Sequence, residues 1–474
     1  MTFHSLHLRG LFVVLCSLGA TAFAADGPTG EVYLQEYAES SKLGFPDRAR
    51  DVTVTHDNGS VYVLGDRGLW GREGDDWRLL SERNLRLMAS SDSDVYVVGE
   101  GAAFVWRRGR LKRLAQLPAF DGAPVRLAVA RDLFVASMGG LYVRVGSTFL
   151  PARRLHRVAG EKRSFRWVAT DPLRDRVAVA GMGGVYLFED DEWKKIAPAG
   201  DSLHDVKAVE FGDEGELWFA SKKRVGVYGR GAWTILGKAD GLPYDDFTTL
   251  CVADDGSPWF GTRKGAIRYD EGVWEYRQGR RWLPGDHVFA TAASNDRSTW
   301  FVTDRGISRI ARRGMSLREK AETFEKAIDQ HHRRTEFGFV DAAYLSAPGD
   351  ISRRTLSPSD NDGLWTSMYG AGECFAWGAF SDPKAKERAH AAFRALKFLG
   401  TVTENSVPSA RPGFVARTVL ESSKRDPNDG RAAVDRKIRA SRDRRWKLLD
   451  PRWPKSGDGE WFWKADTSSD ELDG

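Results

Sequence analysis

Three residues in the C-terminal part of the chain have the types and spacing that acid–base chemistry needs. Asp362, Tyr369 and Glu373 are separated by seven and four positions, so a helix places all three along one face. Burying an unpaired carboxylate costs several kcal/mol. Either this face borders a polar cleft, or cations such as Arg334 and Arg394 pair with the carboxylates. In the first case, Glu373 is the candidate acid or base, with Tyr369 beside it.

The same region contains tryptophans that could stack on sugar rings. Trp365 and Trp463 are the candidate platforms. Polysaccharide lyases use Tyr or His as base and acid, whereas glycoside hydrolases use two carboxylates. The residues leave open whether the protein is an enzyme of either kind. The simpler interpretation of Asp362 is a helix cap. Further acidic candidates are Asp360, Asp466, Asp470 and Glu471.

A second set of candidates is cationic. Each member occupies the seventh position of a repeated seventeen-residue unit, and the set is Arg67, Lys223, Lys264 and Arg305. Equivalent positions in a repeat should lie on one rim of the fold. A rim of cations suits an acidic polysaccharide or another anionic ligand. The alternative is a set of solvated turn charges.

The repeated unit itself predicts the fold. It begins at positions 61, 95, 133, 177, 217, 258 and 299, and a period near 40 residues with strand-like units indicates propeller blades. Each repeat contains four short apolar runs separated by turns, which predicts four strands. We therefore expect a mainly β protein with a seven-bladed β-propeller over residues 25–315. Residues 31–37 form an extra strand, which we expect in the seventh blade, where it closes the ring.

After the propeller the pattern becomes helical. Helices are expected over 316–334, 360–382 and 382–403, the first capped by Ser316 with Glu319 three residues later. The high apolar content of 360–382 indicates an inner helix. Paired inner and outer helices predict a smaller all-α domain, a partial α/α toroid, over 316–474. This span is short for a toroid, so we expect the helical domain to be incomplete.

Residues 1–24 have the features of a signal peptide: Arg9, a short apolar run and an A-x-A site before Ala25. Their removal lowers the formal charge from +5 to +4, and export argues against a nucleic-acid partner. We expect a periplasmic or secreted protein with no membrane span after cleavage. Cys251 and Cys374 then remain, which excludes a disulfide framework. No metal or cofactor motif is present.

Two segments of the repeat match a known sequence motif. Asp240-Gly241-Leu242-Pro243 and Trp259-Phe260-Gly261-Thr262 resemble the two-component regulator propeller repeat, although the first four blades lack the D-G-L-P turn. The segments 360–365, 368–370 and 463–471 resemble a propeller-linked helical domain of exported bacterial proteins. The first resemblance implies a seven-bladed propeller outside the cytoplasm, of a kind found in periplasmic sensors. From this resemblance and the candidate residues, we expect an exported protein that binds, and in one interpretation processes, a carbohydrate. The alternative is a non-catalytic ligand sensor or interaction scaffold, with a protein partner at the propeller rim.

Overall fold

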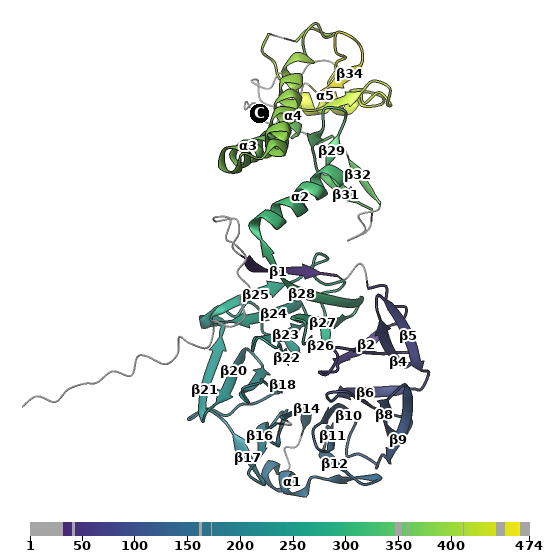
Figure 1. The fold of residues 1–474 in the computed structure, drawn as a ribbon, viewed down its shortest axis with the longest axis vertical. Coiled ribbons are helices and arrows are strands. Elements are labelled where there is room, and N and C mark those ends of the chain that lie inside the picture. Colours follow the sequence, from purple (N-terminus) through teal and green to yellow (C-terminus); the bar gives the residue numbers. More distant parts are fainter. Residues whose placement is uncertain are drawn as a thin grey trace, which may run out of the picture. The chain divides into compact units, whose positions relative to one another are not determined.

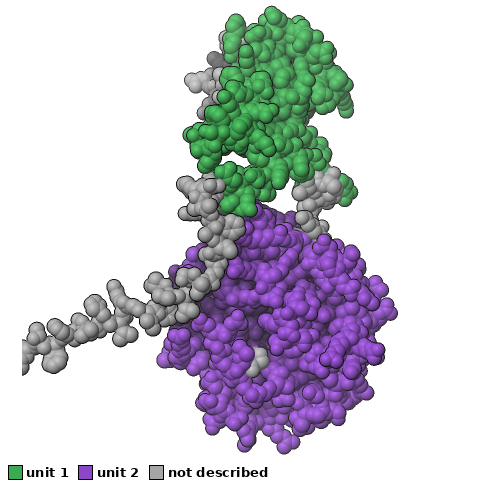
Figure 2. Space-filling view, in the orientation of Figure 1, with its two compact units in different colours: residues 1–32, 316–474 green, residues 33–315 purple. Residues whose placement is uncertain are grey.

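The computed structural model describes residues 32–39, 43–160, 164–171, 173–346, 353–356, 358–359, 361–410, 412–441 and 451–464. The expected signal peptide lies outside these residues. The chain divides into two compact units, and Figure 2 colours them separately. One unit is Tyr33–Met315 and contains the repeats. The other contains the described residues from Ser316 onward.

The repeats fold into seven four-stranded antiparallel sheets, which confirms the seven-bladed β-propeller. We number the blades 1 to 7 in chain order. Blades 1 to 3 contain β2 Ala49–Val54, β3 Val61–Gly65, β4 Leu69–Glu73 and β5 Asp76–Ser81; β6 Leu85–Ser90, β7 Val95–Gly99, β8 Ala102–Arg107 and β9 Arg110–Gln116; β10 Pro124–Val129, β11 Leu133–Ser137, β12 Leu141–Val145 and β13 Thr148–Pro151. A short helix, α1 Arg153–Ala159, follows blade 3.

Blades 4 to 7 repeat this order. They contain β14 Phe165–Asp171, β15 Arg176–Gly181, β16 Gly184–Glu189 and β17 Glu192–Ile196; β18 Val206–Phe211, β19 Leu217–Ser221, β20 Arg224–Gly229 and β21 Ala232–Gly237; β22 Phe247–Val252, β23 Pro258–Thr262, β24 Gly265–Asp270 and β25 Val273–Arg277; β26 Val288–Ser294, β27 Ser298–Thr303 and β28 Gly306–Ser316. The 3-10 turn η3 Lys238–Asp240 follows blade 5. The first strand of every blade lies nearest the centre in Figure 1.

Blade 7 takes its outer strand from the other end of the propeller sequence. β1, Val32–Ala38, lies beside β28, and the sheet order is β1-β28-β27-β26. The two ends of the repeat region therefore share one sheet. A closed ring of this kind leaves only short sheet edges exposed.

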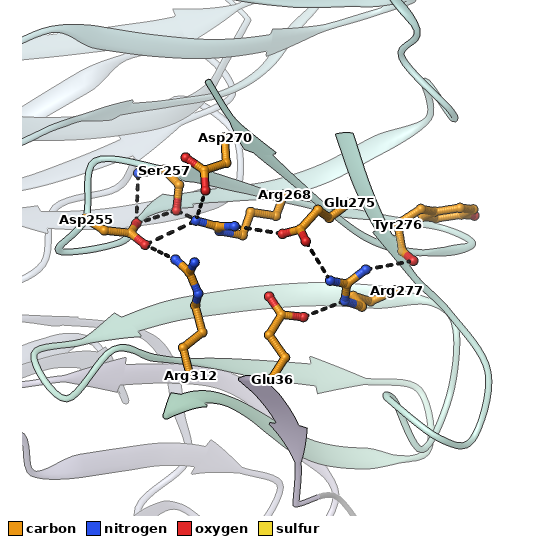
Figure 3. A network of polar contacts seen from close by, with 9 residues as sticks. All are labelled: Glu36, Asp255, Ser257, Arg268, Asp270, Glu275, Tyr276, Arg277 and Arg312. Atoms are coloured by element: carbon orange, nitrogen blue, oxygen red, sulfur yellow. Dashed lines mark hydrogen bonds and ion pairs between the residues drawn. The ribbon is translucent and has the colours of Figure 1, made fainter. Parts of the chain in front are cut away.

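Ion pairs connect this closing sheet to blade 6. Glu36 of β1 accepts a hydrogen bond from Arg277 Nε of β25 at 2.6 Å. In the same part of the molecule, Arg312 of β28 pairs with Asp255 of blade 6. Asp255 also contacts the buried Arg268, at 3.2 Å, and Figure 3 shows the whole network. Blades 6 and 7 are thus joined by charged groups as well as by apolar packing.

Apolar packing between blades fixes their order. The second strands of the blades are almost wholly buried, because neighbouring sheets cover both of their faces. Trp259 of blade 6 contacts Phe301 of blade 7 edge to face, with 5.2 Å between ring centroids. Trp218 of blade 5 contacts Phe260 of blade 6 at 6.5 Å. Edge-to-face pairs of this kind add to the stabilisation from burial alone.

The second unit contains four helices among its described residues, together with pairs of short strands. The elements are α2 Leu317–His331, β29 Arg333–Arg334, β30 Phe339–Val340, β31 Ala343–Leu345, β32 Arg354–Leu356, α3 Asp362–Phe380, α4 Pro383–Thr401, β33 Val419–Glu421, α5 Ala432–Ser441 and β34 Trp461–Trp463. Ser316 and Glu319 form the expected capping box at the start of α2. The short strand pairs were not expected from the sequence.

Helices α3 and α4 form an antiparallel hairpin, because only Ser381 and Asp382 separate them. Gly370 of α3 allows close contact: a Cβ atom there would lie 2.9 Å from the Cβ of Ala392. Among the described residues this hairpin is not extended into a ring of paired helices. The all-α description is therefore too simple, and the α/α toroid stays a prediction.

Candidate functional site

The central channel of the propeller begins among cationic side chains. Each innermost strand starts with a β-bulge, where its pairing with the second strand skips one residue. A bulge re-aims the extra side chain. In blades 1, 2, 4 and 5 the skipped residue is a cation: Arg50, Arg86, Arg166 or Lys207. In blade 3, Arg126 follows directly after the skipped residue.

These side chains line a hollow of about 450 Å³ to which all seven blades contribute. Its aromatic lining residues are Trp167, Phe247 and Phe289. Arg263, from the hairpin between β23 and β24, adds a sixth cation. We call this set the basic mouth: Arg50, Arg86, Arg126, Arg166, Lys207 and Arg263.

Carboxylates pair with four of the six cations. The pairs are Arg50–Asp66 at 3.1 Å, Arg166–Asp205 at 2.5 Å, Lys207–Asp205 at 2.9 Å and Arg263–Asp246 at 3.2 Å. Burial acts to raise the pKa of Asp205, but Lys207 and Arg166 outweigh it and hold that pKa below its usual value. Among the residues that the structure describes, Arg86 and Arg126 have no ion pair. They are the cations most free to bind an anion.

Arg126 lies where the basic mouth narrows into the channel, since it lines both the mouth and the deeper cavity. Its guanidinium lies 3.9 Å from the ring centroid of Trp167, a cation–π contact. Asp51 and Glu210 also line the channel. Burial raises the pKa of both carboxyls, and that of Glu210 reaches about 7, although the charge of Arg126 acts in the opposite direction. Glu210 therefore changes charge near neutral pH.

The deeper cavity has a volume of about 610 Å³ and ends among acidic loops. The charged or titratable residues of this part are His56, Asp92, Asp171, Arg174, Asp213 and Asp254. Carboxylates therefore outnumber cations there. Burial raises the pKa of Asp254, and the negative charge of Asp213 adds to the effect. The two ends of the channel therefore carry opposite charge, and an anion is favoured at the basic mouth.

The four cations picked out by the repeat lie at the same end as the basic mouth. Each is in the hairpin between the second and third strands, and antiparallel pairing brings that hairpin beside the start of the first strand. They come from blades 1, 5, 6 and 7, which are consecutive around the ring. Arg67 pairs with Glu82 at 3.8 Å, Arg305 with Asp304 at 3.8 Å, and Lys264 lies 5.7 Å from the ring centroid of Tyr244. Lys223 is exposed.

Asp362, in the helical unit, does not face a cleft. It is fully buried and pairs with Arg334 of β29, the first of the two partners considered from the sequence. Thr418 donates a hydrogen bond to the same carboxylate at 2.7 Å. Burial raises the pKa of Asp362 to about 6, against the effect of Arg334. A carboxylate enclosed in this way holds α3 to the adjoining strands and is not available to a substrate.

Tyr369 and Glu373 belong to a polar network between α2, α3 and α4. The Tyr369 hydroxyl donates to Glu325 at 2.9 Å and accepts from Arg333 at 2.8 Å. Arg388 of α4 pairs with Glu325 at 3.2 Å. Glu373 is buried, and burial together with the neighbouring Glu325 raises its pKa to about 7. The structure thus brings Tyr369 and Glu373 into one cluster and leaves Asp362 outside it.

The two tryptophans have different environments. Trp463 is fully enclosed in the core of the helical unit, where it contacts Phe414 at 5.6 Å between ring centroids. Its ring cannot stack on a sugar, and that expectation is wrong for this structure. Trp365 is exposed on α3. Asp360, Asp466, Asp470 and Glu471 lie outside the described residues.

Reasoning from the sequence missed the basic mouth. Its signal is a cation directly after the first apolar residue of an innermost strand, as in Leu85-Arg86, Phe165-Arg166 and Val206-Lys207. The repeated seventeen-residue unit begins at the second strand of each blade, so these positions lie outside it. Within the described residues, no group of His, Cys, Asp or Glu side chains is placed to hold a metal ion. None of the described helices has the length and apolar character needed to cross a membrane.

Comparisons with known proteins add little beyond the fold. No family model matches the sequence, and no curated protein matches it. Solved structures align with the propeller. An extracellular domain assigned to a one-component system, BT4673 of B. thetaiotaomicron, is 14% identical over 58% of this chain and 39% of its own, with a TM-score of 0.46. One assigned to a hybrid two-component system, BT3049 of the same organism, is 12% identical over 58% and 41%, with a TM-score of 0.49.

Virginiamycin B lyase from Staphylococcus aureus is 13% identical over 59% of this chain and 99% of its own, with a TM-score of 0.47. The chain spans about two fifths of the length of the first two solved structures that it matches. Similarity at this level identifies no ligand or activity. The assignment of the propeller rests on the strand pairing of the chain itself.

Proposed function

We propose that this protein is a non-catalytic ligand-sensing or interaction scaffold, whose propeller binds an anionic ligand at the basic mouth. The observation that supports the proposal is the presence of Arg86 and Arg126, two cations that form no ion pair with any described residue, in a hollow to which every blade contributes. Fold alone does not assign function, so the proposal depends on this site.

The chemistry of the basic mouth indicates the class of ligand. Guanidinium groups bind carboxylates, sulfates and phosphates through paired N–H donors. Phe289, which is half-buried, offers apolar surface beside those donors, whereas the ring of Trp167 is buried against Arg126. A uronic-acid or sulfated polysaccharide combines repeated anionic groups with sugar faces that pack on aromatic rings. The exposed rim cations Lys223 and Lys264 extend the positive surface for a longer chain of this kind.

The proposed location is the periplasm or the cell exterior. This part of the proposal depends on residues 1–24, whose charged, apolar and small-residue segments have the order of a signal peptide.

The proposal is tested by titrating the protein with polygalacturonate and dextran sulfate, with neutral dextran as the control. We expect binding of the acidic polymers that weakens strongly between low and high salt, because added ions screen exposed charges. Binding of neutral dextran with equal affinity, or no binding of any acidic polymer at low salt, would reject the proposal.

A second candidate function is glycan processing in the helical unit, favoured by the contact of the Tyr369 hydroxyl with Arg333 and Glu325 beside Glu373. A tyrosine next to a cation and a carboxyl with a pKa near 7 has the groups that lyases use. Glu373→Gln should then abolish depolymerisation while leaving polysaccharide binding intact. A parent protein that is inert on a broad panel of glycans excludes this candidate.

A further inference from the structure

Helix α3 has its polar and apolar faces reversed. Asp362, Thr366 and Glu373 point into the unit and are buried. The opposite face carries apolar or small residues only, and these are Leu364, Trp365, Met368, Ala371, Gly372, Phe375, Gly378 and Ala379. A helix on the surface of a soluble protein normally shows the opposite pattern. We call these eight residues the α3 face.

The large side chains of the α3 face are well exposed: Phe375 by 79%, Met368 by 61% and Trp365 by 41%. Isolated exposed apolar residues need no explanation, but a continuous apolar patch marks an interaction site. No charged side chain interrupts this face along the helix, so a partner meets no unpaired charge there.

In the part of the chain that the structure describes, no neighbouring atom requires a glycine at two positions of this face. A Cβ atom at Gly372 or Gly378 would meet no atom within 4 Å. Gly370 differs, since Ala392 of α4 lies against it. Glycine weakens a helix interior relative to alanine. The missing side chains at Gly372 and Gly378 leave room for close approach of a partner helix.

We infer that the α3 face binds the α3 face of a second copy of this protein, in an antiparallel pair. A two-fold axis between Ala371 and Gly372 makes the face complementary to itself. The opposed pairs are then Leu364 with Ala379, Trp365 with Gly378, Met368 with Phe375 and Ala371 with Gly372. Large residues at the ends lie opposite small ones, and the small pair at the axis lets the helices approach closely.

The area of the α3 face is large enough for such a dimer. A buried aromatic side chain covers about 150–250 Å², so the exposed parts of this face sum to roughly 500 Å² per copy. Two copies then bury about 1,000 Å², the lower limit for a specific interface. This points to a reversible dimer, with a dissociation constant within the range that sedimentation measures.

Sedimentation equilibrium of the full chain tests the dimer, compared with Phe375→Glu and with Leu173→Glu as the matched control. Leu173 is an exposed apolar residue of the propeller, so its change leaves α3 intact. We expect the parent and Leu173→Glu to dimerise alike, and Phe375→Glu to raise the dissociation constant by at least tenfold. Unchanged melting of Phe375→Glu shows that the fold is retained.

A second variant tests the geometry of the pair. Gly372→Leu adds apolar surface, so a general apolar attraction predicts tighter association, whereas the close antiparallel pair predicts at least tenfold weaker association. In a Cys374→Ser background, Ala371→Cys should cross-link two copies on oxidation, and Ser367→Cys should not. A parent that stays monomeric, or that associates only with lipid vesicles, would overturn the inference, as would a dimer that Phe375→Glu does not weaken.

Discussion

Arg126 and Glu210 show how single residues set the properties of the basic mouth. Arg126 has no ion pair among the described residues, yet its charge acts on Glu210 in the same channel. Burial dominates at Glu210 and raises its pKa from 4.5 to about 7. The neutral form of Glu210 leaves the positive charge of Arg126 available, whereas the ionised form competes with an incoming anion.

Anion binding should therefore strengthen as the pH falls. Above pH 7, Glu210 is ionised and opposes a bound anion; below pH 7, it takes up a proton and that opposition is lost. We expect a several-fold lower dissociation constant for dextran sulfate, which remains ionised throughout, at pH 6 than at pH 8, measured by calorimetry. At both pH 6 and pH 8, Glu210→Gln should bind dextran sulfate with the affinity that the parent shows at pH 6. Equal pH dependence in parent and variant would show that Glu210 does not act on the site.

The raised pKa of Glu373 has a consequence for stability. A carboxyl with a folded-state pKa above its usual 4.5 favours the protonated folded state. That contribution is complete below about pH 4.5 and is lost as the pH rises to about 7. Glu373→Gln, which cannot ionise, should raise the melting temperature at pH 8 and have little effect at pH 5. An equal change in melting temperature at both pH values would show that altered packing, and not the ionisation of Glu373, causes the change.

At the scale of elements, strand β1 completes blade 7, so its removal tests how the ring of blades is closed. It supplies Glu36, which is largely buried against Arg277 of blade 6. Because β1 is the outer strand of blade 7, its removal uncovers the edge of β28. We expect deletion of residues 31–37 to lower the melting temperature by several degrees or to cause aggregation. Unchanged melting and solubility of the deletion variant would show that the ring does not need this strand.

A single substitution separates the contribution of the Glu36–Arg277 ion pair to stability from the contribution of the whole strand β1. Glu36→Gln removes a charge that Arg277 contacts at 2.6 Å, while Arg277 keeps Glu275 at 3.1 Å. The free energy of unfolding should fall by about 1.5–3 kcal/mol, the range for a hydrogen bond to a charged group. Glu214→Gln, at an exposed ion pair, is the control and should change it by less than about 1 kcal/mol. Denaturant unfolding of both variants gives the comparison.

The sequence predicted the propeller because its blades repeat, and the repeat reports local turns and apolar runs. The helical unit contains no repeat. The helices themselves were predictable from capping at Ser316 and at Asp382, whereas the short strands β29 and β30 depend on partners that sequence periodicity does not reveal. The packing of α3 was expected to be inner, yet its apolar face is exposed.

The candidate site was predicted only in part. Four rim cations were found because they occupy one position of the repeat, but Arg86 and Arg126 are at the bulge, where register shifts between strands. A β-bulge is defined by how two strands pair, so the sequence of one strand does not reveal it. For Asp362 the sequence left open a cleft or an ion pair, and for Trp463 it did not reveal the enclosure of the ring, because a helical face or an aromatic residue does not show what lies against it. Arg334 was already one of two partners considered for Asp362 from the sequence, whereas the contact of Phe414 with Trp463 is visible only in the folded chain.

At the scale of the whole molecule, the protein combines two surfaces of different chemistry. The propeller presents a channel that is basic at one end and acidic at the other. The helical unit presents the apolar α3 face. The first surface suits a charged ligand and the second suits a protein surface, a combination that agrees with a binding scaffold.

The most direct test of the account is binding of dextran sulfate by Arg86→Gln/Arg126→Gln, measured by calorimetry at low salt. The matched control is Arg108→Gln/Arg230→Gln, which removes the same charge from exposed hairpins between third and fourth strands, at the opposite end of the blades. We predict that the control binds like the parent and that the first variant loses at least tenfold in affinity. Equal losses in the two variants, or no loss in the first, would contradict the assignment of the ligand site to the basic mouth.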